Sequence, residues 1–201
     1  MKKCVLFDAD GVTIHGGMWS TEFAKRYGIP EQEVIPFFKG VFGECQSGSK
    51  DMKEELLPWL KKWNWQGSVD DFLNEWFMFC DKPDEEMLVF VQSLRSKGVI
   101  CCLATNNERY RAEYIKQSMG FGNMFDHCFI SSEIGAKKPD MEFYTFILST
   151  IKELHGIEPD NIIYADDSVS GIATAKKLSI DAIEYPGAEV FKDYVQSAIS
   201  Q

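Results

Sequence analysis

Runs of apolar residues alternate with amphipathic segments along the chain, most clearly from Pro83 onward. Nearly continuous apolar runs are typical of strands covered on both faces. They predict strands at residues 5–7, 99–104, 128–130, 162–165 and 182–185. Apolar positions at helical spacing predict helices over residues 84–97, 107–119, 140–155 and 169–178. Repeated strand–helix units of this kind predict an α/β fold with a doubly wound, Rossmann-like parallel sheet covered by helices on both faces.

The longest predicted helix, over residues 140–155, indicates which side chains enter the core. Its apolar stripe consists of Phe143, Phe146, Ile147 and Ile151. Residues three and four apart lie on one face of a helix, so we expect these four to pack against the sheet.

Between residues 14 and 82 the pattern is helical, and it predicts no buried strand. Tryptophans are concentrated in this segment, and we interpret four of them as the core of a small helical bundle rather than as a cage for a ligand. They are Trp59, Trp63, Trp65 and Trp76. The chain is therefore expected to divide into a core domain, residues 1–13 and 83–201, and an inserted helical domain, residues 14–82.

Composition and charge narrow the class of protein. The chain has 201 residues, of which 45% are hydrophobic and 26% charged, as in ordinary globular proteins. A formal net charge of −10 argues against nucleic acid as a partner, although a small phosphorylated molecule needs only one or two local cations. No apolar run approaches the ~20 residues that span a bilayer, so no membrane association is expected. The six cysteines show no CxxC spacing, which argues against a zinc site and favours a reducing, cytoplasmic location for the protein.

The first predicted strand ends in two acidic residues, Asp8 and Asp10, followed directly by Gly11. The strand period of two places both carboxylates on one side, and the glycine permits a sharp turn of the backbone. Such a pair can bind a divalent cation or divide nucleophilic and acid–base work. An ordinary strand-to-turn junction has the same composition, so this segment alone leaves both interpretations open.

The ends of the other predicted strands carry polar residues as well. These are Thr105 and Asn106, then Asp166 and Asp167, with Lys138 in the segment that approaches the 140–155 helix. Each has a simpler explanation, as a helix cap, a helix N-terminus favoured by the dipole, or a solvated lysine. However, the carboxyl ends of parallel strands meet at one edge of a sheet. Their joint occurrence there therefore favours a single site.

These segments resemble, in order, the four motifs of the haloacid dehalogenase-like (HAD) hydrolase superfamily, in the branch with a helical cap inserted after the first strand. The resemblance covers most of the chain and rests on four stretches: Asp8-Ala9-Asp10-Gly11-Val12, Leu103-Ala104-Thr105-Asn106, Lys138-Pro139-Asp140 and Tyr164-Ala165-Asp166-Asp167-Ser168. It implies a HAD core with residues 14–82 as the cap.

The resemblance also implies a role for each residue. Asp8 would be the nucleophile that forms an aspartyl-phosphate, and Asp10 the general acid and base. Mg²⁺ would be held by Asp8, by the backbone carbonyl of Asp10 and by the acidic pair, mainly Asp167 with Asp166. The phosphate would be bound by Thr105, Asn106 and Lys138.

Two features depart from the pattern of many relatives. Many carry a further acid four residues after the second acid of the last motif, where this chain has Gly171. This leaves open how Asp166 and Asp167 share the metal. Lys137 also precedes Lys138, and adjacency to Pro139 favours Lys138 as the site lysine.

The resemblance predicts a Mg²⁺-dependent phosphatase for a small phosphorylated metabolite. Asp10 favours this over a dehalogenase, since relatives that cleave carbon–halogen bonds lack an acid there. A phosphomutase acting on a sugar phosphate is the alternative, and a non-catalytic binding module is a third hypothesis. The sequence leaves open whether the protein is a monomer or a homodimer.

Two segments are weaker candidates for substrate contact. His15, shortly after the first motif, is either a bystander in a hinge or part of the substrate entrance. The glycine-punctuated stretch 40–48 includes Glu44 and Cys45 and follows Lys39. It suits either a loop that meets a ligand or an ordinary turn between helices.

Overall fold

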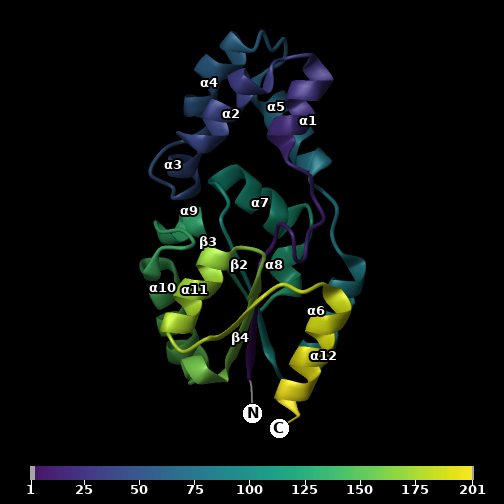
Figure 1. Ribbon diagram of the computed structural model, residues 1–201, viewed down its shortest axis with the longest axis vertical. Helices are drawn as coiled ribbons and strands as arrows, with labels where there is room; N and C mark the ends of the chain where they lie inside the picture. Colours follow the sequence, from purple (N-terminus) through teal and green to yellow (C-terminus); the bar gives the residue numbers. More distant parts are fainter. Residues whose placement is uncertain (1–2, 201) are drawn as a thin grey trace.

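The computed structural model describes residues 3–200, so residues 1, 2 and 201 of the predicted core domain lie outside it. Its five strands form one parallel sheet in the order β3-β2-β1-β4-β5, which confirms the predicted doubly wound α/β fold (Figure 1). The strands are β1 (Cys4–Phe7), β2 (Ile100–Thr105), β3 (His127–Ile130), β4 (Ile162–Asp166) and β5 (Asp181–Glu184). Each lies within one or two residues of its predicted position.

Alternate residues of the central strands point to opposite faces, and each face has its own apolar core. Val5 and Phe7 face α6 (Glu85–Ser96), α8 (Phe121–Met124) and α12 (Ala188–Ile199). Cys4 and Leu6 face α10 (Met141–His155) and α11 (Val169–Lys177). Figure 1 shows α6 and α12 on one side of the sheet and α10 and α11 on the other. Two-sided burial explains why these strands lack an alternating polar pattern.

The stripe predicted for α10 is right at three positions and wrong at the fourth. Phe143, Ile147 and Ile151 are fully buried, whereas Phe146 is 47% exposed. Tyr144 takes the remaining buried position. Phe146 lies at the edge of the stripe, where its ring meets Phe129 edge-on at 6.5 Å.

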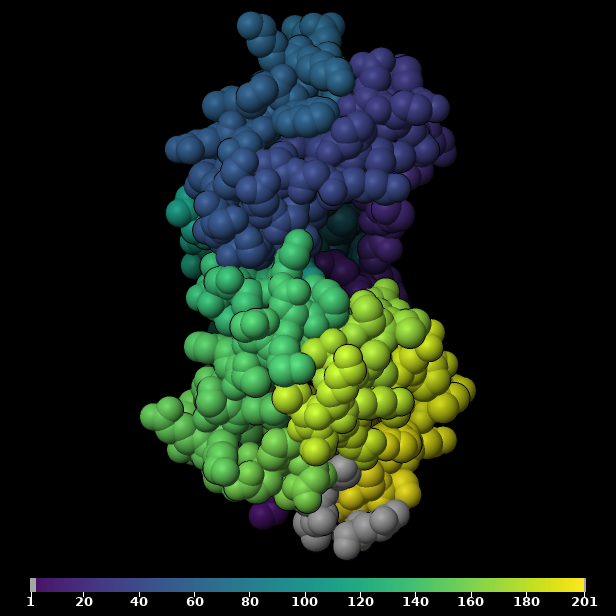
Figure 2. Space-filling view, turned by 60° about the vertical axis from the view of Figure 1, so that its left-hand side comes forward, coloured from purple at the N-terminus to yellow at the C-terminus, as the bar shows by residue number. Residues whose placement is uncertain are grey.

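The five helices between β1 and α6 form a separate bundle, which we call the helical lobe. They are α1 (Trp19–Tyr27), α2 (Glu31–Lys39), α3 (Phe42–Gln46), α4 (Met52–Lys62) and α5 (Val69–Phe79). The lobe has its own apolar cluster, in which Trp63 is buried and Trp59, Trp65 and Trp76 are partly buried, as expected for core residues. We call the rest of the described chain, residues 3–13 and 83–200, the sheet lobe. Figure 2 shows the helical lobe above the sheet lobe, with a hollow between them where the N-terminal segment is visible.

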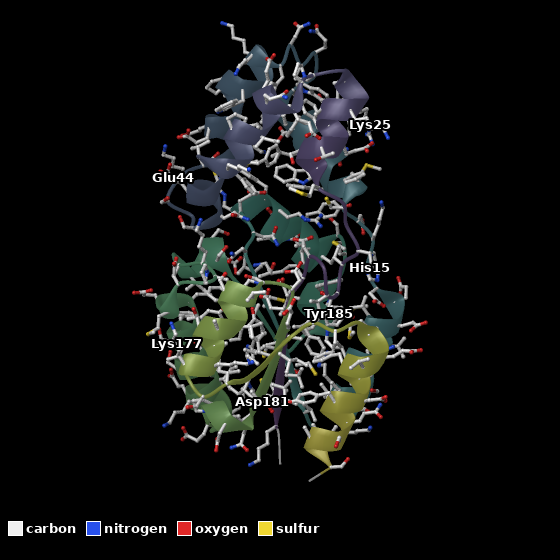
Figure 3. The ribbon with its side chains drawn as sticks, in the orientation of Figure 1. His15, Lys25, Glu44, Lys177, Asp181 and Tyr185 are labelled. Atoms are coloured by element: carbon white, nitrogen blue, oxygen red, sulfur yellow. The ribbon has the colours of Figure 1, made fainter. Side chains whose placement is uncertain are left out.

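Two chain segments connect the lobes and lie side by side. Ile14 forms a β-bridge with Pro83, and the His15 N–H donates to the Lys82 carbonyl at 2.7 Å. The His15 ring pairs through Nε2 with Asp84 at 2.9 Å, which places it in the connection rather than in a ligand site (Figure 3).

The remaining segments are α7 (Arg109–Gln117), α9 (Ser131–Ile134) and a 3₁₀ turn at Pro159–Asn161. The sequence pattern predicted neither α12 nor the short helices α3, α8 and α9. Among residues 3–200, no helix combines the length and apolarity needed to cross a membrane.

Candidate active site

A cavity of about 310 Å³ lies where the carboxyl ends of β1, β2 and β4 meet. β2 lies on one side of β1 and β4 on the other, so the chain reverses its direction across the sheet between these strands. Ligands of doubly wound sheets bind at this switch point. The cavity is lined by all seven residues that the sequence singled out for chemistry and by two others: Asp8, Asp10, Thr105, Asn106, Lys138, Asp166 and Asp167, with Gln46 and Ser168.

The turn after β1 directs Asp8 into this cavity. The Asp8 N–H donates to the Ala165 carbonyl of β4, and its Oδ1 accepts from the Ala9 N–H at 2.7 Å. Gly11 has φ +92°, and a Cβ there would lie 2.7 Å from Oδ2 of Asp167. Glycine is therefore required on two grounds, backbone conformation and the close approach of a carboxylate.

Lys138 is buried between two acids. Its Nζ lies 2.7 Å from Oδ1 of Asp8 and 2.6 Å from Oδ2 of Asp166. The Asn106 side chain fixes the lysine's backbone, because its Nδ2 donates to the Lys138 carbonyl at 2.9 Å and its Oδ1 accepts from the Lys138 N–H at 2.8 Å. The ammonium is thus held in place from both ends of the residue.

The charges of the acids around Lys138 favour the binding of an additional cation. Burial raises the pKa of Asp8 to about 7; Lys138 opposes this rise and Asp166 adds to it. Burial opposes the charge of Lys138 too, but Asp8 and Asp166 outweigh it and raise the pKa of the lysine. Burial and the neighbouring Asp166 also raise the pKa of Asp167. One buried lysine therefore leaves this acidic cluster under-neutralised.

The donor set fits a hard divalent cation such as Mg²⁺. Carboxylate oxygens of Asp8, Asp166 and Asp167 all lie within 4.8 Å of one another, and such oxygens are the ligands that Mg²⁺ prefers. Asp166 already has three partners: the Lys138 Nζ, the Ser168 N–H at 2.6 Å and the buried Tyr164 hydroxyl. Asp167 is exposed to the cavity, so its oxygens are the more available of the pair.

Asp10 lies across the cavity and is directed by other groups. Its Oδ2 accepts from Asn107 Nδ2 at 3.4 Å, and its Oδ1 is 3.8 Å from Nη2 of Arg111. Asn107 also donates to Oγ1 of the buried Thr105 at 2.9 Å. The side chain of Asp10 is 50% exposed, in contrast to the buried Asp8. The two acids thus sit in different environments, which suits different chemical roles.

Three residues near the site were missed from the sequence. Gln46, in the helical lobe, reaches the cavity, and its Nε2 donates to the Asn106 carbonyl at 3.0 Å. It belongs to the glycine-punctuated stretch that the sequence marked, but nothing distinguished it from its neighbours. Arg111 and Asn107 looked like ordinary residues of a polar helix start.

The weaker candidates of that stretch lie elsewhere. Cys45 is buried in the apolar cluster of the helical lobe, and Lys39 is exposed. Glu44 lies on the outer side of the lobe, where it pairs with Lys50 at 3.5 Å (Figure 3). Lys137 is only partly exposed, and its Nζ donates to the Gly43 carbonyl at 3.3 Å rather than entering the cavity.

Position 171 has a steric reason to be glycine in this chain. A Cβ at Gly171 would lie 2.9 Å from the hydroxyl of the buried Tyr144. The further acid that many relatives carry at this position has no room here.

Comparison with known proteins identifies the family. A sequence profile described as haloacid dehalogenase-like hydrolase matches residues 2–178. The chain belongs to this hydrolase family. The resemblance drawn from the four motifs is therefore confirmed.

Characterised relatives and a solved structure agree with this assignment. The chain is 25% identical over 193 residues to validoxylamine A 7'-phosphate phosphatase of Streptomyces hygroscopicus subsp. limoneus, covering 90% of this chain and 84% of that one. It is 23% identical over 198 residues to the phosphorylated carbohydrates phosphatase of Thermotoga maritima, covering 90% and 83%. A HAD family enzyme from Bacteroides thetaiotaomicron, crystallised with magnesium and inorganic phosphate, superposes with a TM-score of 0.75 at 22% identity, covering 94% and 96%. This last similarity shows that the HAD hydrolase shares its fold with that enzyme.

Proposed function

We propose that the protein is a Mg²⁺-dependent phosphatase that hydrolyses a small phosphorylated metabolite through an aspartyl-phosphate on Asp8. The observation that carries the proposal is the convergence of the Asp8, Asp166 and Asp167 carboxylates beside the buried Lys138. Anions of the substrate would be repelled by these acids unless a cation lay between them.

Asp8, the backbone carbonyl of Asp10 and the acidic pair, mainly Asp167 with Asp166, would hold the metal. Asp166 also holds the Lys138 ammonium in place. When bound, Mg²⁺ would offset the charge of the acids and stabilise the charge on the phosphoryl oxygens. Thr105, Asn106 and Lys138 would bind the same oxygens by hydrogen bonds and by charge.

The chemistry then divides between the two acids of the first motif. A carboxylate oxygen of Asp8 forms a bond to phosphorus as the bond to the leaving oxygen breaks, and Asp10 gives that oxygen a proton. Water next attacks the phosphorus of the aspartyl-phosphate as the bond to the Asp8 oxygen breaks, and Asp10 takes up a proton of that water. Inorganic phosphate is released and both carboxylates return to their starting states.

The size and cover of the cavity support a small substrate. About 310 Å³ lies at the lower end of the range for ligand pockets, enough for a phosphate and a compact organic group. We assign the helical lobe, residues 14–82, as the cap that closes over it, because Gln46 already reaches the site from α3. Phosphorylated carbohydrates suit this proposal, since the relative from Thermotoga maritima is named for such substrates.

A reducing, cytoplasmic location fits the same proposal. All six cysteines are free, and most are buried among apolar residues. The formal net charge of −10 also favours a small metabolite over nucleic acid as the partner.

Phosphate release from a panel of esters tests the proposal. The panel contains p-nitrophenyl phosphate and phosphorylated metabolites such as glucose 6-phosphate and glycerol 3-phosphate. Each ester is assayed with and without Mg²⁺. We expect metal-dependent release by the wild type and a loss of at least about 1,000-fold in Asp8→Asn, because the nucleophile is removed. Asp193→Asn, a matched change on α12, should retain full activity.

Two outcomes would contradict the proposal. Undiminished release by Asp8→Asn would show that another group is the nucleophile. No release from any ester would reject the phosphatase, and isomerisation assays with sugar phosphates would then test the mutase.

A further inference from the structure

Arg111 is a charged side chain that is buried in the protein interior, where charged side chains are rare. Among the described residues, Arg111 and Lys138 are the buried basic side chains, and Arg111 is only 4% exposed. It belongs to α7, directly after the β2 motif, and thus to the sheet lobe. Burying a guanidinium costs free energy unless its N–H donors are hydrogen-bonded and its charge is paired.

Two of its partners belong to the helical lobe. Nη1 donates to the Phe77 carbonyl at 3.3 Å and Nη2 to the Cys80 carbonyl at 3.1 Å. These carbonyls lie at the C-terminal end of α5, where the helix dipole favours a cation. The guanidinium also lies over the rings of Phe77 and Tyr114, at 5.6 and 5.5 Å.

Its remaining partner is Asp10. Nη2, the nitrogen that donates to Cys80, is 3.8 Å from Oδ1 of Asp10. The second oxygen of Asp10 accepts from Asn107 at 3.4 Å. These are the contacts that orient a carboxylate whose side chain is otherwise half exposed.

We propose that Arg111 is a positioning residue that ties the carboxylate of Asp10 to the helical lobe, so that Asp10 is held in place for proton transfer when the lobe covers the cavity. The inference rests on the proposed function, in which Asp10 protonates the leaving oxygen. The planar guanidinium presents donors in a fixed fork, so one side chain can hold two carbonyls and face a carboxylate at the same time. Lysine has one ammonium on a flexible stem and cannot reproduce this geometry.

A comparison of two substrates separates this role from a structural one. p-Nitrophenolate leaves without help from an acid, whereas an alkoxide requires a proton. General acid catalysis is typically worth about 100- to 10,000-fold, so a misplaced Asp10 should slow alkyl esters selectively. For Arg111→Gln we expect the ratio of kcat/KM for an alkyl ester to kcat/KM for p-nitrophenyl phosphate to fall at least about tenfold. The parameter kcat/KM covers the steps up to formation of the aspartyl-phosphate and excludes the attack of water, in which Asp10 serves both substrates alike. The alkyl ester is whichever of glucose 6-phosphate and glycerol 3-phosphate the wild type hydrolyses faster.

Arg95→Gln is the matched control. Arg95 also donates to two carbonyls, those of Asn123 and Met124, and pairs with a carboxylate, Asp126, at 2.9 Å. It does not line the cavity, so its loss should lower stability and leave the ratio within about twofold. Arg111→Lys keeps the charge without the fork and should lower the ratio by at least about threefold.

An unchanged ratio in Arg111→Gln would overturn the inference and leave Arg111 a structural residue. If that variant does not fold, the ratio in Arg111→Lys decides in the same way. Absence of wild-type turnover on every ester would count against the phosphatase and not against Arg111.

Hydrogen exchange on the metal-free protein tests the link to the helical lobe without activity. Exchange of the amides of residues 78–82 should be at least about tenfold faster in Arg111→Gln than in the wild type, because the end of α5 loses two donors. Arg95→Gln should leave these amides unchanged. Equal protection in Arg111→Gln and the wild type would refute the link.

Discussion

At the scale of single residues, the site depends on which oxygen or nitrogen each side chain meets. Asp8 and Asp10 are two positions apart, yet one is buried against Lys138 and the other half exposed beside Arg111. The sequence predicted both as site residues because a strand end and a glycine are local features. It did not predict Arg111 as the neighbour of Asp10, because that contact depends on how α7 packs.

The neighbouring lysines provide a prediction at this scale. Lys138 contacts two acids of the cavity, whereas Lys137 donates to a backbone carbonyl of the helical lobe. Lys138→Ala should lower kcat by at least about 100-fold, because a preorganised charge on the phosphate is lost from a buried site. Lys137→Ala, the matched control, should stay within about threefold. Comparable losses in steady-state assays of the two variants would contradict the assignment.

At the scale of elements, the positions of most strands and helices followed from the apolar pattern, and capping side chains mark where some of these helices begin. Asp84 caps α6 through the Met87 N–H, at the predicted start of that helix. The pattern failed for α12 and for the short helices. A helix of four or five residues completes too few turns to show a periodicity, so its existence depends on neighbouring elements.

The N-terminus of α7 gives a prediction for pH dependence. Glu108 is almost fully buried there and accepts from the Tyr110 and Arg111 N–H groups, both at 2.7 Å. Burial raises its pKa from 4.5 to about 7, Asp51 adds to the rise, and the two N–H groups and Arg111 oppose it. Between these pH values the folded protein keeps a proton that the unfolded chain has lost, so this group lowers the free energy of unfolding as pH rises.

Glu108→Gln removes this titration. Relative to the variant, the wild type should lose up to about 3 kcal/mol of unfolding free energy between about pH 4.5 and about pH 7.5. Urea titrations of both proteins across this range measure the difference. Parallel pH profiles would show that Glu108 ionises in the folded protein as it does in the unfolded chain.

At the scale of the whole molecule, the two lobes have separate apolar cores, joined by polar contacts and by Tyr110 and Tyr114 of α7, which pack against the cluster of the helical lobe. Arg109 pairs with Asp51, and Gln46 and Lys137 donate to carbonyls across the boundary. All five tryptophans lie between residues 19 and 76, so tryptophan fluorescence reports on the helical lobe alone.

The lobes should therefore unfold in two steps. A core made from about 60 residues is marginal on its own, so the helical lobe should unfold first. We expect the fluorescence transition to have a lower urea midpoint than the transition followed by circular dichroism. Coincident curves would instead indicate one cooperative unit.

The sequence by itself determined the parallel sheet, the order of its strands along the chain and the seven residues that line the cavity, because these follow from apolar runs and from short motifs. Six of the seven lie at or just beyond strand ends, and Lys138 lies in the segment before α10. Only the tertiary structure decided which groups complete the site: Gln46 beside the Asn106 carbonyl, and Asn107 and Arg111 beside Asp10. The physical reason is the range of the interactions. Strands, turns and caps are set by residues a few positions apart, whereas these partners are brought together by the packing of whole helices and strands, which no local pattern records.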